Sequence, residues 1–401
     1  MVRFTLTQTV FEGTCVGLQK LFLRFNKLSS LPATIGELRK LENLSVRNNR
    51  LVEVPGTINN LTNLEVLDLQ HNKLHSLPSL GNLLKLQSLD VQYNKLHDLP
   101  SDIGLLTNLQ GLHLKYNQLA TIPPAIGNLV KIAELDLEGN KLTTIPSELE
   151  KLTGLSKLYI SYNQLESLPE SFHRITTLQD LLVNDNHLTE IEEIVQITQL
   201  KILNISHNHL KQLPPLIKQL QLLKEFRLAA NELVELAPEI GELKCLTVLD
   251  LNDNFLKTLP PAIGNLKQLT ILHAGGNELE SVPDELGELT SLAKLFLGFN
   301  KLKTLTGNIG NLMNLKELNL DENQLTALPA SLGKMEGLEV LTFNDNELND
   351  LPNEIYNLDN LRIFGMDDNP LADIPDHITD MGSQEVFNYL GERIRQSNQN
   401  K

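Results

Sequence analysis

The chain contains 401 residues, of which 41% are hydrophobic, 21% are charged and only 4% are aromatic. Trp is absent, so the apolar residues are mainly aliphatic, as expected for a core built by regular stacking. The 34 basic and 50 acidic residues give a net charge of −16. This charge argues against nucleic acid or an anionic membrane as the partner and favours a basic protein surface.

Two further classes are disfavoured by the sequence. No run approaches the ~18 apolar residues of a transmembrane helix, and residues 1–17 lack the basic-then-apolar order of a signal peptide. The two cysteines, Cys15 and Cys245, lie far apart in the chain, which excludes a disulfide framework and a cysteine zinc site. We therefore expect a cytoplasmic protein without a transmembrane segment. The alternative is a secreted chain whose signal peptide preceded Met1.

Residues 1–17 differ in pattern from the rest of the chain. Val2, Phe4 and Leu6 alternate with other residues, and Glu12-Gly13 is a turn signal. A repeat array needs a cap because the apolar flank of its first coil has no neighbour. We expect an edge strand or small hairpin that forms an N-terminal cap over 1–17.

Residues 18–375 form one long series of internal repeats. The pattern L-x-x-L-x-L-x-x-N-x-L or a close variant occurs sixteen times, for example at residues 64–74 and 315–325. Thirteen of the fifteen intervals between successive asparagines of this pattern are 23 residues long, and two are 22. Such a period identifies a repeat architecture.

Each repeat predicts a short strand followed by a turn. Leucines two residues apart point to one face of a strand, and the residues between them point to the other. The asparagine side chain both donates and accepts, so stacked asparagines can satisfy the backbone of neighbouring coils. In the second half, L-P-x-x-I-G-x-L, we expect Pro to end the strand-side turn and Gly to permit a tight outer bend. The predicted fold class is an α/β solenoid (horseshoe) of about 16 repeats, with a parallel sheet on the concave face and irregular or helical turns on the convex side.

Two places depart from the repeat, and the end of the chain changes character. Residues 79–82 are one residue short of the pattern, and residues 191–199 lack both Pro and Gly, which predicts an altered outer coil there. Residues 383–396 carry apolar side chains at helical spacing, including Val386, Phe387 and Leu390. We expect residues 376–401 to form a C-terminal capping helix and tail.

The repeat sequence also carries a family resemblance. The 23-residue L-P-x-x-I-G-x-L form resembles the intracellular Ras-group leucine-rich repeat proteins, including the Ras-suppressor scaffold family, and is similar to the arrays of Scribble- and Erbin-type scaffolds and of Roco proteins. The resemblance covers Leu18 to about Pro375. It implies a signalling scaffold whose partner is a small GTPase or a signalling complex. A receptor-type recognition protein and the repeat region of a larger multidomain protein are the alternatives.

The residues that the sheet displays follow from the third, fifth, seventh and eighth positions of L-x-x-L-x-L-x-x-N. The first two repeats display a basic and aromatic corner: Phe22, Arg24, Phe25 and Arg47. Repeats three to seven display rows of carboxylates, histidines and tyrosines: Asp68, His71, Asp90, Tyr93, His113, Tyr116, Asp136, Tyr159 and Tyr162. Aromatic side chains with polar ends are enriched among interface anchors, so we expect a protein partner to bind here. Simple packing of these tyrosines along their neighbours is the alternative interpretation.

A second candidate surface lies farther along the chain. Phe296 and Phe299 occupy displayed positions of one repeat, among repeats rich in Asp and Glu. Exposed Phe surrounded by carboxylates suits a basic partner with an apolar centre.

The motifs of enzymes are missing from the sequence. Neither a phosphate-binding G-x-x-x-x-G-K-[ST] loop nor a strand-linked G-x-G-x-x-G occurs. The row Asp68, Asp90, His113 and Asp136 could hold a divalent cation, but carboxylates on an open sheet without backbone oxygens make a weak site. We therefore predict a non-catalytic scaffold without cofactor or metal, which binds a protein on its concave face.

Overall fold

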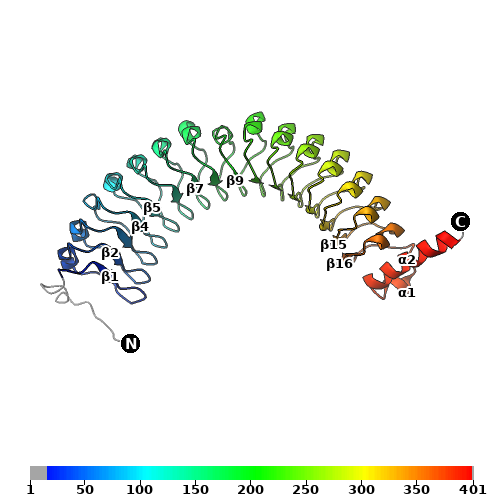
Figure 1. The fold of residues 1–401 in the computed structure, drawn as a ribbon, viewed down its shortest axis with the longest axis horizontal. Coiled ribbons are helices and arrows are strands. Elements are labelled where there is room, and N and C mark those ends of the chain that lie inside the picture. The colour runs from blue at the N-terminus through cyan, green and yellow to red at the C-terminus, as the bar shows by residue number, and fades with distance from the viewer. Residues whose placement is uncertain (1–15, 400–401) are drawn as a thin grey trace. The chain divides into compact units, whose positions relative to one another are not determined.

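The computed structural model describes residues 16–399, and the chain divides between Leu200 and Lys201 into two compact units. In both units each repeat contributes one three-residue strand, and most repeats contribute a five-residue 3-10 helix on the opposite face (Figure 1). Residues 1–15, where the N-terminal cap is predicted, lie outside the described residues, and so does Cys15.

The first unit contains eight strands and six 3-10 helices among its described residues. Its strands are β1 (Lys20–Phe22), β2 (Asn43–Ser45), β3 (Val66–Asp68), β4 (Ser88–Asp90), β5 (Gly111–His113), β6 (Glu134–Asp136), β7 (Lys157–Tyr159) and β8 (Asp180–Leu182). Its 3-10 helices are η2 (Ala33–Glu37), η3 (Gly56–Asn60), η4 (Ser101–Leu105), η5 (Pro124–Asn128), η6 (Ser147–Lys151) and η7 (Glu170–Arg174).

The second unit repeats this arrangement and ends in two α-helices. Its strands are β9 (Ile202–Asn204), β10 (Glu225–Arg227), β11 (Val248–Asp250), β12 (Ile271–His273), β13 (Lys294–Phe296), β14 (Glu317–Asn319), β15 (Val340–Thr342) and β16 (Ile363–Gly365). Its helices are η8 (Pro215–Gln219), η9 (Pro238–Glu242), η10 (Pro261–Asn265), η11 (Asp284–Glu288), η12 (Gly307–Asn311), η13 (Ala330–Lys334), η14 (Asn353–Asn357), α1 (Asp376–Thr379) and α2 (Ser383–Gln399).

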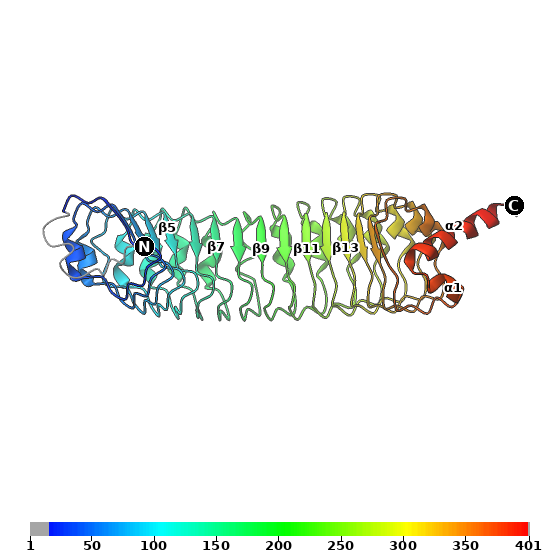
Figure 2. The ribbon, with the colours of Figure 1, turned by 90° about the horizontal axis from the view of Figure 1, so that it is seen from below.

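The strands are parallel and follow chain order, so the sixteen-repeat parallel-sheet solenoid predicted from the sequence is confirmed. In the first unit Leu67 of β3 pairs with Leu44 of β2 and Leu89 of β4, all at the same repeat position. The second unit keeps this register. Figure 2 shows its strands lying side by side. Equal repeat positions therefore form rows across each unit's sheet. We call the face that carries the third, fifth, seventh and eighth positions the strand face.

The core of each unit lies between the strands and the outer turns. Leu155, Leu158 and Ile160 occupy the first, fourth and sixth positions of one repeat, and all three are fully buried. Burying a leucine side chain stabilises the fold by about 1.5–3 kcal/mol, and the same positions are buried in nearly every repeat. Stacking of aliphatic side chains is therefore the main source of stability.

The repeated asparagine satisfies the backbone where each strand turns outward. Asn140 donates from Nδ2 to the carbonyl oxygens of Leu137 (2.9 Å) and of Leu114 in the preceding repeat (3.2 Å). Its Oδ1 accepts from the backbone N–H of Leu119 at 3.1 Å. The side chain thus links two consecutive coils, as the sequence predicts, and removes buried unsatisfied groups.

The recurring glycine of the outer turn has a different role from the predicted one. The repeat pattern predicts that Gly permits a sharp bend, but Gly127 in η5 does not adopt a positive φ. A Cβ at this position would collide with the carbonyl oxygen of Glu148 in the next coil. The glycine is therefore needed because neighbouring 3-10 helices approach closely. Proline precedes the helix, as at Pro123 with φ −65° and ψ 140°.

The two 22-residue repeats differ from the others on the outer side. In the described residues, the segments between β3 and β4 and between β8 and β9 form turns and contain no 3-10 helix. In the first of these, the backbone N–H of Leu83 donates to the carbonyl oxygen of Leu80 at 2.9 Å. In the second, the Ile194 N–H donates to Ile191 at the same distance. The predicted change of the outer coil at residues 191–199 is confirmed.

The C-terminal helix α2 packs against the last coils of the second unit, next to η14. Val386 and Leu390 are fully buried, and the Phe387 ring meets the Phe364 ring edge-on at 6.2 Å between centroids. A C-terminal helix is thus present where the sequence predicts one. The domain boundaries at 17/18 and 375/376 stay predictions.

An ion pair also joins α2 to these coils. Arg393 donates two hydrogen bonds, of 2.6 and 2.8 Å, to the two carboxylate oxygens of Asp350. These bonds hold the pKa of Asp350 below its usual range. The stability that they contribute is present above the ordinary carboxyl pKa and is lost as pH falls through the lowered value.

Candidate protein-binding surface

The eighth residue of each repeat has a positive φ in both units. Where this residue is not glycine, φ lies between 52° and 56°, in the left-handed helical region. That region is uncommon for residues other than Gly, Asn and Asp, and holding another residue there costs roughly 1–3 kcal/mol. Five repeats nevertheless have an aromatic residue at this position: Phe25, Tyr93, Tyr116, Tyr162 and Phe299. The same φ occurs at Ala230 and Glu322, so the repeat fold imposes this conformation whatever the side chain.

In the first unit three of the eighth-position rings form a continuous stack. The His71 and Tyr93 rings lie 4.2 Å apart and nearly parallel, and the Tyr93 and Tyr116 rings lie 5.0 Å apart. The next eighth-position residue is Gly139, where a Cβ would collide with the Tyr116 ring. Tyr93 and Tyr116 are still 37% and 39% exposed. The rings of the stack are therefore held by contacts with one another, and their remaining surface is exposed to solvent and accessible to a partner.

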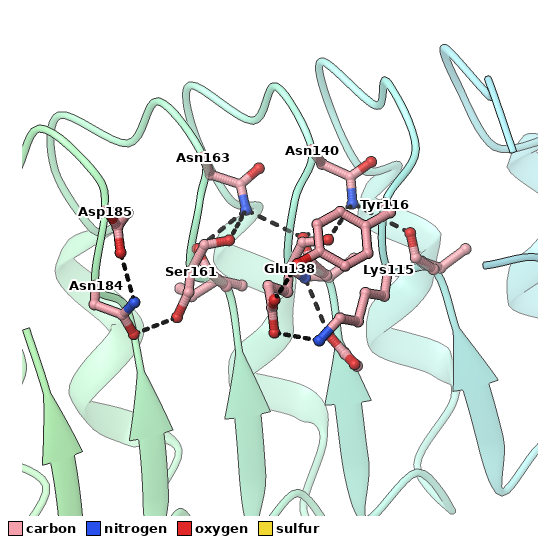
Figure 3. Close-up of polar contacts among 12 residues, drawn as sticks. Lys115, Tyr116, Glu138, Asn140, Ser161, Asn163, Asn184 and Asp185 are labelled. Carbon is pink, nitrogen blue, oxygen red and sulfur yellow. Dashed lines mark hydrogen bonds and ion pairs between the residues drawn. The ribbon is translucent and has the colours of Figure 1, made fainter. Parts of the chain in front are cut away.

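Tyr116 is further fixed by two charged neighbours (Figure 3). Its hydroxyl donates to Glu138 at 2.9 Å, and Lys115 donates to the other carboxylate oxygen of Glu138 at 2.6 Å. The hydrogen bond to Glu138 raises the pKa of Tyr116, so the phenol stays protonated at neutral pH. Burial works to lower the pKa of Lys115, but Glu138 outweighs it and raises that pKa. Lys115 and Glu138 are not among the residues predicted from the sequence, although opposite charges at the same position of adjacent repeats are a usable signal.

Tyr162 lies in the next repeat but one and is 52% exposed. Beside it Ser161 donates to Asn184 at 2.6 Å, and Asn184 donates to Asp185 at 2.7 Å (Figure 3). This chain of hydrogen bonds orders the polar side chains around the tyrosine. The region from His71 to Tyr162 thus presents tyrosine rings next to polar side chains that are held by hydrogen bonds.

The fifth-position residues predicted for the site lie in one row. Strand pairing places Asp68, Asp90, His113, Asp136 and Tyr159 next to one another in that order, which brings the predicted residues together. We call these five residues with His71, Tyr93, Tyr116 and Tyr162 the N-terminal patch.

The carboxylates of this row also have a local structural role. Asp90 and Asp136 each accept a hydrogen bond from the backbone N–H two residues later, at 3.1 and 3.0 Å. Burial raises the pKa of both carboxyl groups. The side chain of Asn204 accepts the corresponding hydrogen bond from the backbone N–H of Ser206 at 3.1 Å, so an amide can replace the carboxylate in this role. The row therefore stabilises the strand ends whatever it binds.

The structure offers no support for a metal centre in the row. Among residues 16–399, no group of three or more His, Cys, Asp or Glu side chains is arranged to hold a metal ion. Cys245, the cysteine within that range, is a free, partly buried thiol.

The residues of the basic and aromatic corner lie together, and each phenylalanine ring has an arginine guanidinium over it. The Arg24 guanidinium lies 4.7 Å from the centre of the Phe22 ring, and that of Arg47 lies 5.6 Å from the Phe25 ring. Arg24 Nε also donates to Ser45 at 2.8 Å. Phe22 and Phe25 stay 52% and 71% exposed, so the corner combines positive charge with apolar surface.

Phe296 and Phe299 lie in the second unit, where they border a hollow of about 550 Å³ on the strand face. Phe299 is 63% exposed, and the Phe296 ring stacks on His273 with 4.6 Å between centroids. We call this space the glycine hollow; it is lined by Asn252, Asp253, His273, Gly275, Gly276, Phe296, Gly298, Phe299 and Asn319. Its glycines are not among the residues predicted from the sequence, although Gly at three displayed positions of adjacent repeats indicates a surface without side chains there.

Three family models match the chain. Two of them, described as "Leucine rich repeat" and "Leucine-rich repeat region", match residues 39–96, 84–142, 131–188 and 313–371, and residues 216–303, respectively. A third, "Leucine Rich Repeat", matches residues 199–220. Together the matches cover more than half of the chain. The comparison with curated proteins found no match.

Solved structures with the same fold come from bacteria and plants. A leucine-rich repeat protein of Leptospira interrogans is 36% identical, with a TM-score of 0.80, over 87% of this chain and 90% of that one. YopM of Yersinia enterocolitica is 27% identical, with a TM-score of 0.67, over 90% and 71% of the two chains. The ectodomain of the Arabidopsis receptor kinase HAESA, solved with an IDA peptide hormone ligand, is 29% identical, with a TM-score of 0.67, over 88% and 62%.

Proposed function

The chain belongs to the leucine-rich repeat family, and from this premise we propose that it is a non-catalytic scaffold that binds another protein through the N-terminal patch. Leucine-rich repeat proteins are generally interaction modules. No α-helix among the described residues has the length and apolarity needed to cross a bilayer.

The stack of Tyr93 and Tyr116 is the observation that carries this proposal. Both rings are held by neighbours before any partner arrives, so binding would freeze little side-chain motion. Tyrosine supplies a large, rigid contact area with a polar end, which is why it is enriched at interface hot spots. The chain keeps these rings at left-handed positions despite the backbone cost, and binding supplies a reason for that.

Charge supports a basic partner surface. The chain has a net charge of −16, and carboxylates border the tyrosines of the N-terminal patch. Complementary charge mainly raises the association rate and sets orientation, whereas the rings determine how slowly the complex dissociates.

Replacing Tyr116 and Tyr162 together by Ala tests the proposal. A partner captured by the wild-type protein is purified and titrated against both forms by surface plasmon resonance. We expect the double variant to bind about 2 kcal/mol more weakly, roughly a 30-fold loss, mostly through faster dissociation.

Phe255→Ala is the matched control, since it removes an aromatic ring of similar exposure outside the patch. Its affinity for the partner should equal that of the wild type. Equal affinity of the Tyr116→Ala, Tyr162→Ala variant would show that the partner binds elsewhere.

The compartment and the partner class are narrower predictions. The Ras-group resemblance supports cytoplasmic signalling with a small GTPase or signalling complex as the partner. The HAESA ectodomain, solved with a peptide hormone, supports the alternative of a receptor-type recognition protein. Fractionation of source cells, probed with an antibody to the chain, separates the two. Recovery from the medium or the cell surface would reject cytoplasmic signalling.

A further inference from the structure

The chain contains the same nine-residue sequence twice, with one difference. Residues 20–28 read K-L-F-L-R-F-N-K-L and residues 294–302 read K-L-F-L-G-F-N-K-L. The two copies occupy equal repeat positions, on β1 and β13, and differ only by Arg24 in one and Gly298 in the other. The surroundings of their phenylalanines can therefore be compared directly.

In the first copy the protein's own cations lie over the rings, which stay 52% and 71% exposed at their other faces and edges. Arg24 lies over Phe22 and Arg47 lies over Phe25, at 4.7 and 5.6 Å from the ring centres. A guanidinium over an aromatic face is a favourable arrangement, worth about 0.5–1 kcal/mol when exposed and more when water is excluded.

In the second copy Gly298 replaces this arginine, and the Asn319 amide lies against the position that a Cβ of residue 298 would take. Gly298 has no side chain, and with Gly275 and Gly276 it leaves the glycine hollow beside Phe296 and Phe299. No Lys or Arg among residues 16–399 lies over either ring.

The described residues around the hollow present negative charge. The Asp253 carboxylate lies against Gly276, where a Cβ would collide with it, and it receives no hydrogen bond or ion pair from the described residues. The nearby Lys294 is paired with Glu317 at 2.8 Å. His273 is half-buried, and burial lowers its pKa, so its imidazole is neutral at pH 7.

We propose that the glycine hollow binds the guanidinium group of an arginine side chain on an extended segment of a partner protein. The guanidinium stacks on the Phe296 and Phe299 rings and pairs with Asp253. This proposal rests on the proposed role in protein binding, but it concerns a separate surface with its own ligand.

Arginine fits this hollow better than lysine. Its planar group stacks on aromatic rings and presents several N–H donors at once, whereas an ammonium is a compact, strongly hydrated charge. Besides Asp253, the side-chain amides of Asn252 and Asn319 border the hollow and can accept such donors.

The test is a titration of the full chain with the peptide acetyl-Gly-Arg-Gly-amide, measured by isothermal calorimetry. The matched peptide carries citrulline, which has the shape of arginine without its charge. We expect saturable binding of the arginine peptide, and binding at least about tenfold weaker for the citrulline and lysine peptides. Equal binding of the citrulline peptide, or no saturation up to about 10 mM arginine peptide, overturns the proposal.

Substitutions locate the binding. Phe299→Ala should lower the affinity for the arginine peptide by about tenfold, and Asp253→Asn should lower it by a similar factor. Phe255→Ala, which removes an exposed ring outside the hollow, should leave the affinity unchanged. Unchanged affinity in Phe299→Ala overturns the assignment to this hollow.

A further variant places an arginine side chain of the protein itself in the hollow. Gly298→Arg recreates the first copy, and Asn319→Ser removes the side chain that would clash and supplies the hydroxyl that Ser45 presents to Arg24. This double variant should fold and lose peptide binding, whereas Asn319→Ser alone, which leaves the hollow open, should retain most of it. Retained binding in the folded double variant contradicts the proposal.

The outcome is independent of the N-terminal patch. The peptide titration needs no native partner, and the Tyr116→Ala, Tyr162→Ala variant should bind the arginine peptide as the wild type does. Failure of the tyrosine experiment with a positive peptide titration rejects only the patch, and the reverse result rejects only the hollow.

Discussion

In the first unit, Phe22 lies beneath the guanidinium of Arg24, whereas the corresponding Phe296 of the second unit stacks on His273 and borders an open hollow. The strands around the two rings have the same sequence apart from one residue. In a repeat protein the fold thus places the ring, and the displayed residues around it decide which group stacks on the ring. Surface chemistry can change by one substitution while the core stays the same.

The largest expected effect is a loss of stability, and it should differ between the two copies because one lies at the start of the array and the other lies inside it. Leu295 is fully buried between coils, whereas the equivalent Leu21 is only partly buried. Leu295→Ala should lower the free energy of unfolding by about 2–5 kcal/mol, and Leu21→Ala by clearly less. Urea unfolding followed by circular dichroism measures both. Equal losses would show that the first coil is as tightly packed as an inner one.

A smaller effect is expected from converting the first copy into the second. Arg24→Gly removes the guanidinium over Phe22 and its hydrogen bond to Ser45, and we expect a loss of about 1 kcal/mol in unfolding free energy. Arg24→Lys keeps the charge but not the planar group, so its unfolding free energy should lie between those of the wild type and Arg24→Gly. If Arg24→Gly unfolds like the wild type, the arginine does not stabilise the ring.

The smallest effect concerns Asp136, whose position is occupied by Asn204 in the second unit. Burial raises the pKa of Asp136, so its ionised form costs folding free energy, and this cost appears as pH rises through the raised pKa. Asp136→Asn should therefore be as stable as the wild type or slightly more stable at pH 7. Its advantage should shrink below about pH 4, where Asp is protonated in both the folded and unfolded states. Urea unfolding at both pH values decides this, and an advantage that grows on acidification would contradict it.

The N-terminal patch shows how far position in the repeat predicts a site. Placing Asp68, Asp90, His113 and Asp136 in one row needed only the repeat register, because parallel strands in equal register align equal positions. The bonds that hold Tyr116 could not be derived in the same way. They depend on rotamers of Lys115 and Glu138, which lie on adjacent coils 23 residues apart.

The sequence alone determined the repeat architecture, the parallel strands, the buried leucines and the asparagine contacts, because these follow from periodicity and from the need to satisfy buried backbone groups. Three features were decided only by the tertiary structure. These are the collision that requires Gly127, the left-handed backbone beneath the aromatic rings, and the glycine hollow. The collision and the hollow depend on how closely adjacent coils approach, and the left-handed φ is a dihedral angle of the folded turn. The repeat pattern specifies which residues face one another but neither these distances nor this angle.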